Sequence, residues 1–286
     1  MNVKQRGLWT DVWNRMRRNK SAVVGMIMLL LILIVVFAAP LFIDYNTAVL
    51  TPNYDRILKF PAEGTLLGGD ELGRDIFARI LYGGKISITL AFVSIAISAT
   101  IGLGIGCIAG YYGGIVDTLF MRTLDVVMAI PSVLLVITIV TVFKPSLVTL
   151  LFALAFSDIP AEARLIRGQV LTVKNQEYIE AIKAQGASDF RVIFGHILPN
   201  AISPFISNIM QNVAGAIMQI SALSFIGLGV QAPNPEWGAM LASGRAFIRD
   251  SFHVTLFPGI AIVLTVVALT LVGDGLRDAL DPRMKR

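Results

Sequence analysis

The chain has 286 residues, of which 55% are hydrophobic and only 15% are charged, and its mean hydropathy is +0.73. Soluble domains rarely have this composition, and several apolar runs are long enough to cross a bilayer, which excludes a soluble globular protein. The net charge of +5 does not indicate nucleic-acid binding, because the basic residues lie dispersed at the ends of apolar segments.

The apolar runs predict an all-α polytopic membrane protein with six spans, because about 30 Å of hydrocarbon takes about 20 helical residues. The predicted spans are 22–43, 86–109, 119–143, 146–168, 201–229 and 254–273. We interpret the first as a retained anchor, since its run is too long for a signal peptide. The fourth is apolar only over 146–157 and must continue through Asp158 to complete its crossing.

Six spans place both termini on one side of the membrane, and the positive-inside rule selects the cytoplasm. With this orientation most of the 24 Lys and Arg residues lie in cytoplasmic segments. The loops 44–85 and 230–253 are then outside, and the polar segment 177–200 is inside. We divide the chain into 1–85, with the tail, first span and outer loop, and a five-helix core, 86–286.

Two segments, one before the second span and one within it, each have a helical face with a single type of residue, apolar in the first and glycine in the second. In 67–83, apolar residues at helical spacing begin at Ile76 beside Arg74 and Arg79, a pattern typical of a helix on the membrane surface. Further on, glycines recur every four residues, which predicts close helix packing rather than a nucleotide-binding loop. They are Gly102, Gly106 and Gly110.

The polar segment 177–200, EYIEAIKAQGASDFRVIFGHILPN, predicts two short helices separated at Gly186. Ser188 is a candidate N-cap of the second helix, and Pro199 is expected to end it. An apolar face follows at i, i+3, i+4 and i+7: Phe190, Ile193, Phe194 and Ile197. This apolar face is expected to pack against something: either the rest of the protein or the lipid interface, or a cytosolic partner. The helical periodicity does not decide between these alternatives.

The same segment resembles the EAA loop of bacterial ABC importer permeases, which docks on the ATPase subunit. The matching residues are Glu180-Ala181, Gly186 and Ile197-Leu198-Pro199, while Ile182 and His196 differ from the general pattern. The variant 196-HILPN-200 is typical of the dipeptide, oligopeptide and nickel permeases. The segments 67–83, 223–238 and 273–283 are also similar to signatures of that family, in its C-type second permease.

The resemblance implies a type I ABC importer permease fold, with a cytoplasmic coupling loop between spans 4 and 5, in a prokaryotic plasma (inner) membrane. It implies half of a translocation pathway for di- or oligopeptides or a related small solute. The partners would be a second homologous permease, one or two cytosolic ABC ATPases, an extracytoplasmic solute-binding protein and membrane lipid, without nucleic acid. ATP and magnesium would bind the ATPases, because this chain has no P-loop sequence; we expect no cofactor and no catalysis here. The expected coupling residues are Glu180, Ala181, Gly186, Phe190, Phe194, Ile197, Leu198 and Pro199.

The fifth span carries a polar stripe at helical spacing: Asn208, Gln211, Asn212, Gly215 and Gln219. Lipid would not tolerate these amides, so they are either hydrogen-bonded to a neighbouring helix, for about 0.6 kcal/mol each, or line a hydrated pathway. The resemblance favours the pathway for Asn208, Gln211, Asn212 and Gln219. Asp158 is either functional or an acid at the inner interface with Arg164 or Arg167 nearby.

Two alternatives belong to other classes of protein. An ATP-independent secondary transporter or channel would need its own coupling site, and only the shallow Asp158 is evident. A membrane enzyme would need a catalytic constellation, yet the only histidines, His196 and His253, are predicted on opposite sides of the membrane.

Overall fold

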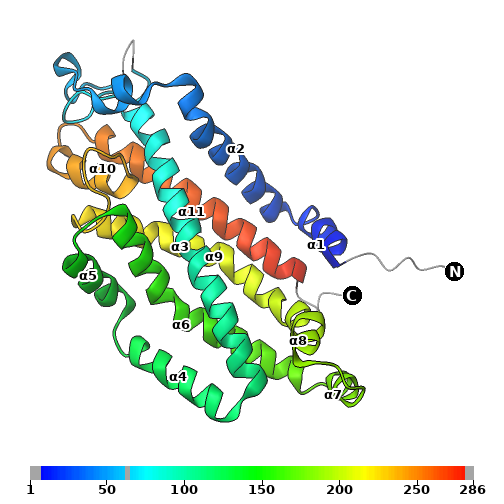
Figure 1. The fold of residues 1–286 in the computed structure, drawn as a ribbon. Helices are drawn as coiled ribbons and strands as arrows, with labels where there is room; N and C mark the ends of the chain where they lie inside the picture. The colour runs from blue at the N-terminus through cyan, green and yellow to red at the C-terminus, as the bar shows by residue number, and fades with distance from the viewer. Residues whose placement is uncertain (1–7, 62–64, 281–286) are drawn as a thin grey trace.

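The structure is a computed structural model that describes residues 8–61 and 65–280, and these residues are nearly all helical, without a strand. The end of the 273–283 signature, residues 281–283, lies outside them. The α-helices are α1 (Leu8–Met16), α2 (Lys20–Phe42), α3 (Ile76–Tyr112), α4 (Gly114–Met128), α5 (Ser132–Phe143), α6 (Leu147–Lys174), α7 (Glu177–Ala184), α8 (Asp189–Val192), α9 (Leu198–Phe225), α10 (Trp237–Gly244) and α11 (His253–Leu280). Figure 1 shows α2, α3, α6, α9 and α11 as long helices of one bundle, with α7 and α8 at one end and α10 near the other.

The predicted all-α membrane fold is confirmed, although the exact number of spans stays a prediction. Four helical segments of the described residues are long and apolar enough to cross a membrane: α2, α3, Asp189–Phe225 and α11. A fifth is obtained if α4 and α5 form one broken span. The helix α6 has 28 residues but carries Asp158, Glu162 and Arg164 among its apolar residues, and it does not pass the same test.

The predicted span 119–143 is not one straight helix. The axes of α4 and α5 differ by 78° at a break between Met128 and Ser132. Pro131 explains the break, because it lacks a backbone N–H and disfavours helical angles at Ile130 before it.

The prediction of a surface helix around 76–81 is also wrong, because these residues begin the spanning helix α3. Asp75 caps α3 by accepting hydrogen bonds from the amides of Phe77 and Ala78, at 2.8 and 3.3 Å. The helix then continues for 37 residues. Its apolar side chains at Ile76, Ile80 and Leu81 pack into the protein core rather than against lipid headgroups.

The predicted glycine face of α3 packs closely on α6, as expected. A Cβ atom at Gly102 would lie 2.5 Å from Glu162 Cβ, and one at Gly106 would lie 2.4 Å from the carbonyl oxygen of Ala163. Gly110 meets Val170 in the same way, at 2.8 Å. The two helix backbones therefore approach at a distance that only glycine permits.

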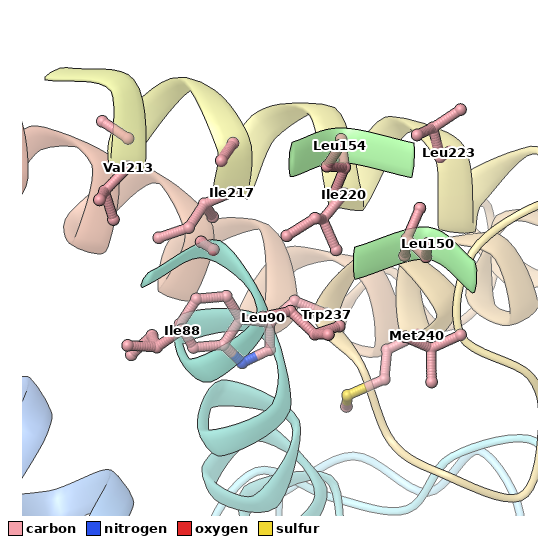
Figure 2. Close-up of a cluster of buried hydrophobic side chains, with 14 of the residues drawn as sticks. Ile88, Leu90, Leu150, Leu154, Val213, Ile217, Ile220, Leu223, Trp237 and Met240 are labelled. Carbon is pink, nitrogen blue, oxygen red and sulfur yellow. The ribbon is translucent and has the colours of Figure 1, made fainter. Parts of the chain in front are cut away.

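A large apolar cluster joins α3, α6, α9 and α10, and Figure 2 shows part of it around Trp237. The indole of Trp237 is 1% exposed and donates a 2.9 Å hydrogen bond to the carbonyl of Ile80. Beside it, the buried carboxylate of Glu236 accepts hydrogen bonds from Ser87 Oγ at 3.0 Å and the amide of Ala239 at 2.9 Å. These bonds fix α10 across the first turns of α3.

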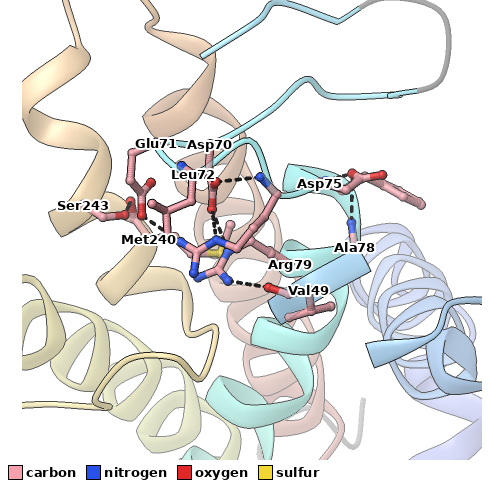
Figure 3. Close-up of polar contacts among 11 residues, drawn as sticks. Val49, Asp70, Glu71, Leu72, Asp75, Ala78, Arg79, Met240 and Ser243 are labelled. Carbon is pink, nitrogen blue, oxygen red and sulfur yellow. Dashed lines mark hydrogen bonds and ion pairs between the residues drawn. The ribbon is translucent and has the colours of Figure 1, made fainter. Parts of the chain in front are cut away.

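A buried polar network secures the loop that precedes α3. Asp70 Oδ2 lies 2.7 Å from Arg74 Nε and 3.2 Å from Arg79 Nε, and Arg74 also pairs with Glu71. Arg79 Nη1 donates to the carbonyl of Val49 at 2.9 Å (Figure 3). The network ties the N-terminal loop to the beginning of α3.

Candidate functional site

The segment 177–200 forms two short helices at one end of the bundle, as predicted, and we call it the coupling segment. Gly186 has φ +82°, a left-handed conformation that separates α7 from α8 and favours glycine. Ser188 is the N-cap of α8, with its hydroxyl accepting a long hydrogen bond, 3.5 Å, from the amide of Arg191. Both local predictions are confirmed.

The prediction that Pro199 ends the second helix is wrong. A π-helical turn, Ile193–Ile197, joins α8 directly to α9, and the amide of Leu198 bonds to the carbonyl of Ile193. Pro199 then falls in the first turn of α9, directly after the π-helical turn. The coupling segment is consequently continuous with a spanning helix.

The apolar face of the coupling segment is partly buried by the protein and partly exposed. Ile197 is fully buried with Ile179 and Val192 in a second apolar cluster that includes residues of α3, α6 and α9. Phe190 and Phe194 point outward, 71% and 53% exposed, with ring centroids 4.5 Å apart. The segment therefore packs back on the protein through its aliphatic residues and leaves an aromatic pair uncovered.

The other predicted coupling residues lie on or near the surface of the same segment. Glu180, Ala181, Gly186 and Pro199 are exposed, and Leu198 is half-buried. Glu180 has no ion-pair partner among the described residues.

Tyr111, at the end of α3, contacts the coupling segment, a role that the sequence reasoning missed. Its hydroxyl donates a 2.5 Å hydrogen bond to Asp189 of α8, and the ammonium of Lys183 lies 4.7 Å from its ring centroid. The carbonyl of Tyr111 accepts a bond from Lys174 Nζ. The one sequence signal that could have indicated this contact is the pair Tyr111–Tyr112, which follows the glycine face at the end of α3.

Residues of the polar stripe of α9 line a cavity and also bond to neighbouring helices. Asn208 and Gln211 line a cavity of about 650 Å³ between α6, α9 and α11, with mostly neutral polar neighbours. Gln211 also donates to Asp274 of α11 at 2.8 Å, and Asn212 donates to Glu162 of α6 at 2.5 Å. The cavity is lined by Leu165, Gln169, Thr172, Asn200, Ser203, Pro204, Ser207, Asn208, Gln211, Arg277 and Leu280.

The two remaining positions of the stripe do not line this cavity. Gly215 has open space where a side chain would begin, and Gln219 is half-buried.

The expected arginine neighbours of Asp158 bind other acids. Arg164 pairs with Asp125, and Arg167 pairs with Asp117. Both acids belong to α4, so these ion pairs bridge α4 and α6 beside a cavity of about 560 Å³. Asp158 itself accepts a long hydrogen bond from Ser157, at 3.4 Å, and within the described residues neither arginine is its partner, so the interpretation as an interfacial acid paired with one of them is not supported.

The helical arrangement matches the membrane subunits of solved ABC importers. A chain of an amino acid ABC transporter superimposes with a TM-score of 0.57 at 15% identity, covering 70% of this chain and 94% of that one. A chain of the MetNI methionine ABC transporter, in an inward-facing conformation, gives 0.58 at 18%, covering 71% and 96%. The fold is that of a type I ABC importer permease.

The family follows from the sequence profiles. Residues 102–286 match the profile described as binding-protein-dependent transport system inner membrane component, and residues 7–61 match the N-terminal TM domain of oligopeptide transport permease C. The chain belongs to this family of inner membrane components and is a permease subunit of an ABC importer. Membership decides against the ATP-independent transporter or channel, and the family is one of transport permeases rather than enzymes.

Relatives named for peptide solutes cover almost the whole chain. The dipeptide transport system permease protein DppC of Alkalihalophilus pseudofirmus is 41% identical over 277 residues, 97% of this chain and 90% of the relative. The glutathione transport system permease protein GsiD of Pectobacterium atrosepticum is also 41% identical over 277 residues, 97% of this chain and 92% of the relative.

Proposed function

We propose that the chain imports di- or oligopeptides, or a related small solute such as glutathione, as one half of a pathway shared with a second homologous permease. The names of the 41% identical relatives support this solute class. The cavity beside Asn208 and Gln211 supports it as well, because neutral amides and hydroxyls exchange hydrogen bonds with a peptide backbone without trapping it. In this proposal Asn208, Gln211, Asn212 and Gln219 line the pathway, and a separate extracytoplasmic binding protein delivers the solute.

The exposed pair Phe190–Phe194 is the observation that carries the coupling part of the proposal. Aromatic side chains with large exposed areas are typical anchors for a protein partner. Burying the exposed parts of both rings would remove roughly 200 Å² from water, for at most about 5 kcal/mol. The proposed partner is a cytosolic ABC ATPase, which would bind ATP and magnesium itself, and both termini of this chain would lie in the cytoplasm.

The buried half of the coupling segment gives the docked partner a rigid connection to the spans. Ile179, Val192 and Ile197 are fully buried, and α8 continues through the π-helical turn into α9. Movement of the ATPases on ATP binding would then tilt α9 and expose the pathway to alternate sides of the membrane.

A pull-down of the gently solubilised complex tests the docking claim. We expect wild type to recover a cytosolic ATPase and a second permease, and the double variant Phe190→Asp/Phe194→Asp to recover only the permease. Tyr54→Asp is the matched control, because Tyr54 is 77% exposed in the loop predicted on the opposite side. Undiminished ATPase recovery by the double variant would remove the docking claim.

The solute class is tested separately in proteoliposomes that contain the complete importer. Binding-protein-dependent uptake of a radiolabelled dipeptide is compared with uptake of glutathione, with and without ATP. ATP-dependent uptake of neither compound would contradict the proposed class of solute and leave the docking result untouched.

A further inference from the structure

The N-terminal helix α1 is held firmly against the end of α11. Val12 and Met16 lie one turn apart and are buried in a small cluster with Val272 and Ala279. Arg15 Nη1 donates to the carbonyl of Ala279 at 3.4 Å. Figure 1 shows α1 turned from the line of α2 and lying beside the end of α11.

Asn19 fixes the corner between α1 and α2. Its side-chain oxygen caps α2 by accepting from the amides of Ser21 and Ala22, at 3.1 and 3.3 Å. Its amide nitrogen donates to Asp278 of α11 at 3.2 Å. The orientation of α1 relative to two spanning helices is therefore determined by direct contacts.

The length of α2 places this corner at the membrane surface. Its 23 residues extend about 34 Å at about 1.5 Å per residue, which matches a hydrocarbon core of about 30 Å. Residues 17–20 are therefore expected at the level of the lipid headgroups.

The exposed surface of α1 and of the corner that follows it carries one aromatic and three basic side chains. Trp13 is 52% exposed, with the guanidinium of Arg17 at 5.9 Å from its ring centroid. Arg18 and Lys20 are exposed as well. Within the described part of the chain, none of the three cations forms an ion pair. Asp11 is the acidic residue of α1, and Asp278 at the nearby end of α11 is bonded to Asn19.

We infer that this face, formed by Trp13, Arg17, Arg18 and Lys20, binds the headgroups of anionic phospholipids. Tryptophan partitions to the headgroup level, and a fixed cluster of unpaired cations there attracts negative lipid phosphates. The buried apolar side of α1 distinguishes the arrangement from a free amphipathic helix, because the cations are presented by a rigid support. The charge excess therefore selects anionic over zwitterionic headgroups at this one corner of the permease.

Tryptophan quenching by brominated lipid in nanodiscs tests the inference on the full chain. The variants carry Trp9→Phe, so that Trp13 and the buried Trp237 are the remaining tryptophans. Brominated phosphatidylglycerol and brominated phosphatidylcholine are compared at equal mole fraction. We expect a preference for phosphatidylglycerol of about fivefold for each basic residue in contact, decreasing as salt is raised from about 0.05 to 0.5 M.

Two double variants separate a local site from a general effect of charge. Arg17→Gln/Arg18→Gln should lose the preference, while Arg17→Lys/Arg18→Lys should keep most of it. Lys59→Gln/Arg249→Gln removes the same charge from exposed loop residues predicted on the opposite side, and it should behave as wild type. All variants are compared after gel filtration as monodisperse protein.

Two results would overturn the inference. The first is equal quenching of wild type by both lipids, and the second is an unchanged preference in Arg17→Gln/Arg18→Gln. If the second result is accompanied by a loss of ATPase from the complex, the face would instead be assigned to a protein partner.

Discussion

The contact between α3 and α6 predicts that alanine is tolerated at one glycine of α3 and destabilising at another, so each substitution serves as the control for the other. At Gly106, an alanine Cβ would lie 2.4 Å from the carbonyl oxygen of Ala163 and 2.9 Å from Ile166 Cγ2. At Gly104, half a turn away, nothing lies within 4 Å. Both substitutions gain the same helix propensity, so their difference in stability reports the steric conflict alone.

Gly106→Ala should be less stable than Gly104→Ala by about 1–3 kcal/mol. This is the usual cost of forcing an extra carbon into a close-packed contact, and here the obstructing atom belongs to backbone that cannot rotate away. At about 2–4 °C for each kcal/mol, the unfolding temperatures should differ by about 2–12 °C. Thermal unfolding of the detergent-solubilised chain, followed by circular dichroism, measures the difference. Equal unfolding temperatures would refute the close approach of α3 and α6.

Three further changes test other parts of the structure. Asp70→Asn should destabilise the protein by about 3–5 kcal/mol, because it leaves the buried Arg74 and Arg79 short of an opposite charge, while Asp55→Asn at an exposed site should be neutral in the same unfolding assay. Burial raises the pKa of Glu236 and outweighs the hydrogen bonds it accepts, which lower the pKa. The folded state therefore binds this proton more tightly than the unfolded chain does. The resulting stabilisation is complete below the unfolded pKa of about 4.3 and is lost as pH rises through the raised folded pKa. Over that range the unfolding temperature of wild type should therefore fall relative to that of Glu236→Gln. Parallel pH profiles of the two proteins would contradict this prediction. Gly186→Pro should leave membrane insertion intact but separate ATP hydrolysis from uptake, because proline cannot adopt φ +82°, and normal coupled uptake would disprove it.

The sequence was informative where a local rule decides the structure. The left-handed angle at Gly186 and the cap at Ser188 depend on side chains within a few residues, and both occur as predicted. The glycine face of α3 also occurs as predicted, since repeated small residues indicate a close contact whichever helix supplies the other side. The resemblance around 177–200 identified the family because its motif is local.

The wrong predictions concern partners or breaks that tertiary structure decides. Arg164 and Arg167 are about two and two and a half helical turns from Asp158, yet they pair with acids of α4, and no periodicity in α6 reveals that choice. Pro131 and Pro199 both predict the end of a helix, but only Pro131 coincides with one. Pro131 breaks a helix, whereas the π-helical turn before Pro199 lets the chain remain helical.

The length of α3 has a mechanical consequence. Its 37 residues extend about 55 Å, well beyond the thickness of the hydrocarbon core. Arg79 near its start is bonded to the network around Asp70, and Tyr111 near its end is bonded to α8. A single strut therefore connects the loop before α3 with the coupling segment at the far end of the bundle. A displacement at Tyr111 would therefore be carried along one continuous helix to Arg79, past the close contact of the α3 glycines with α6.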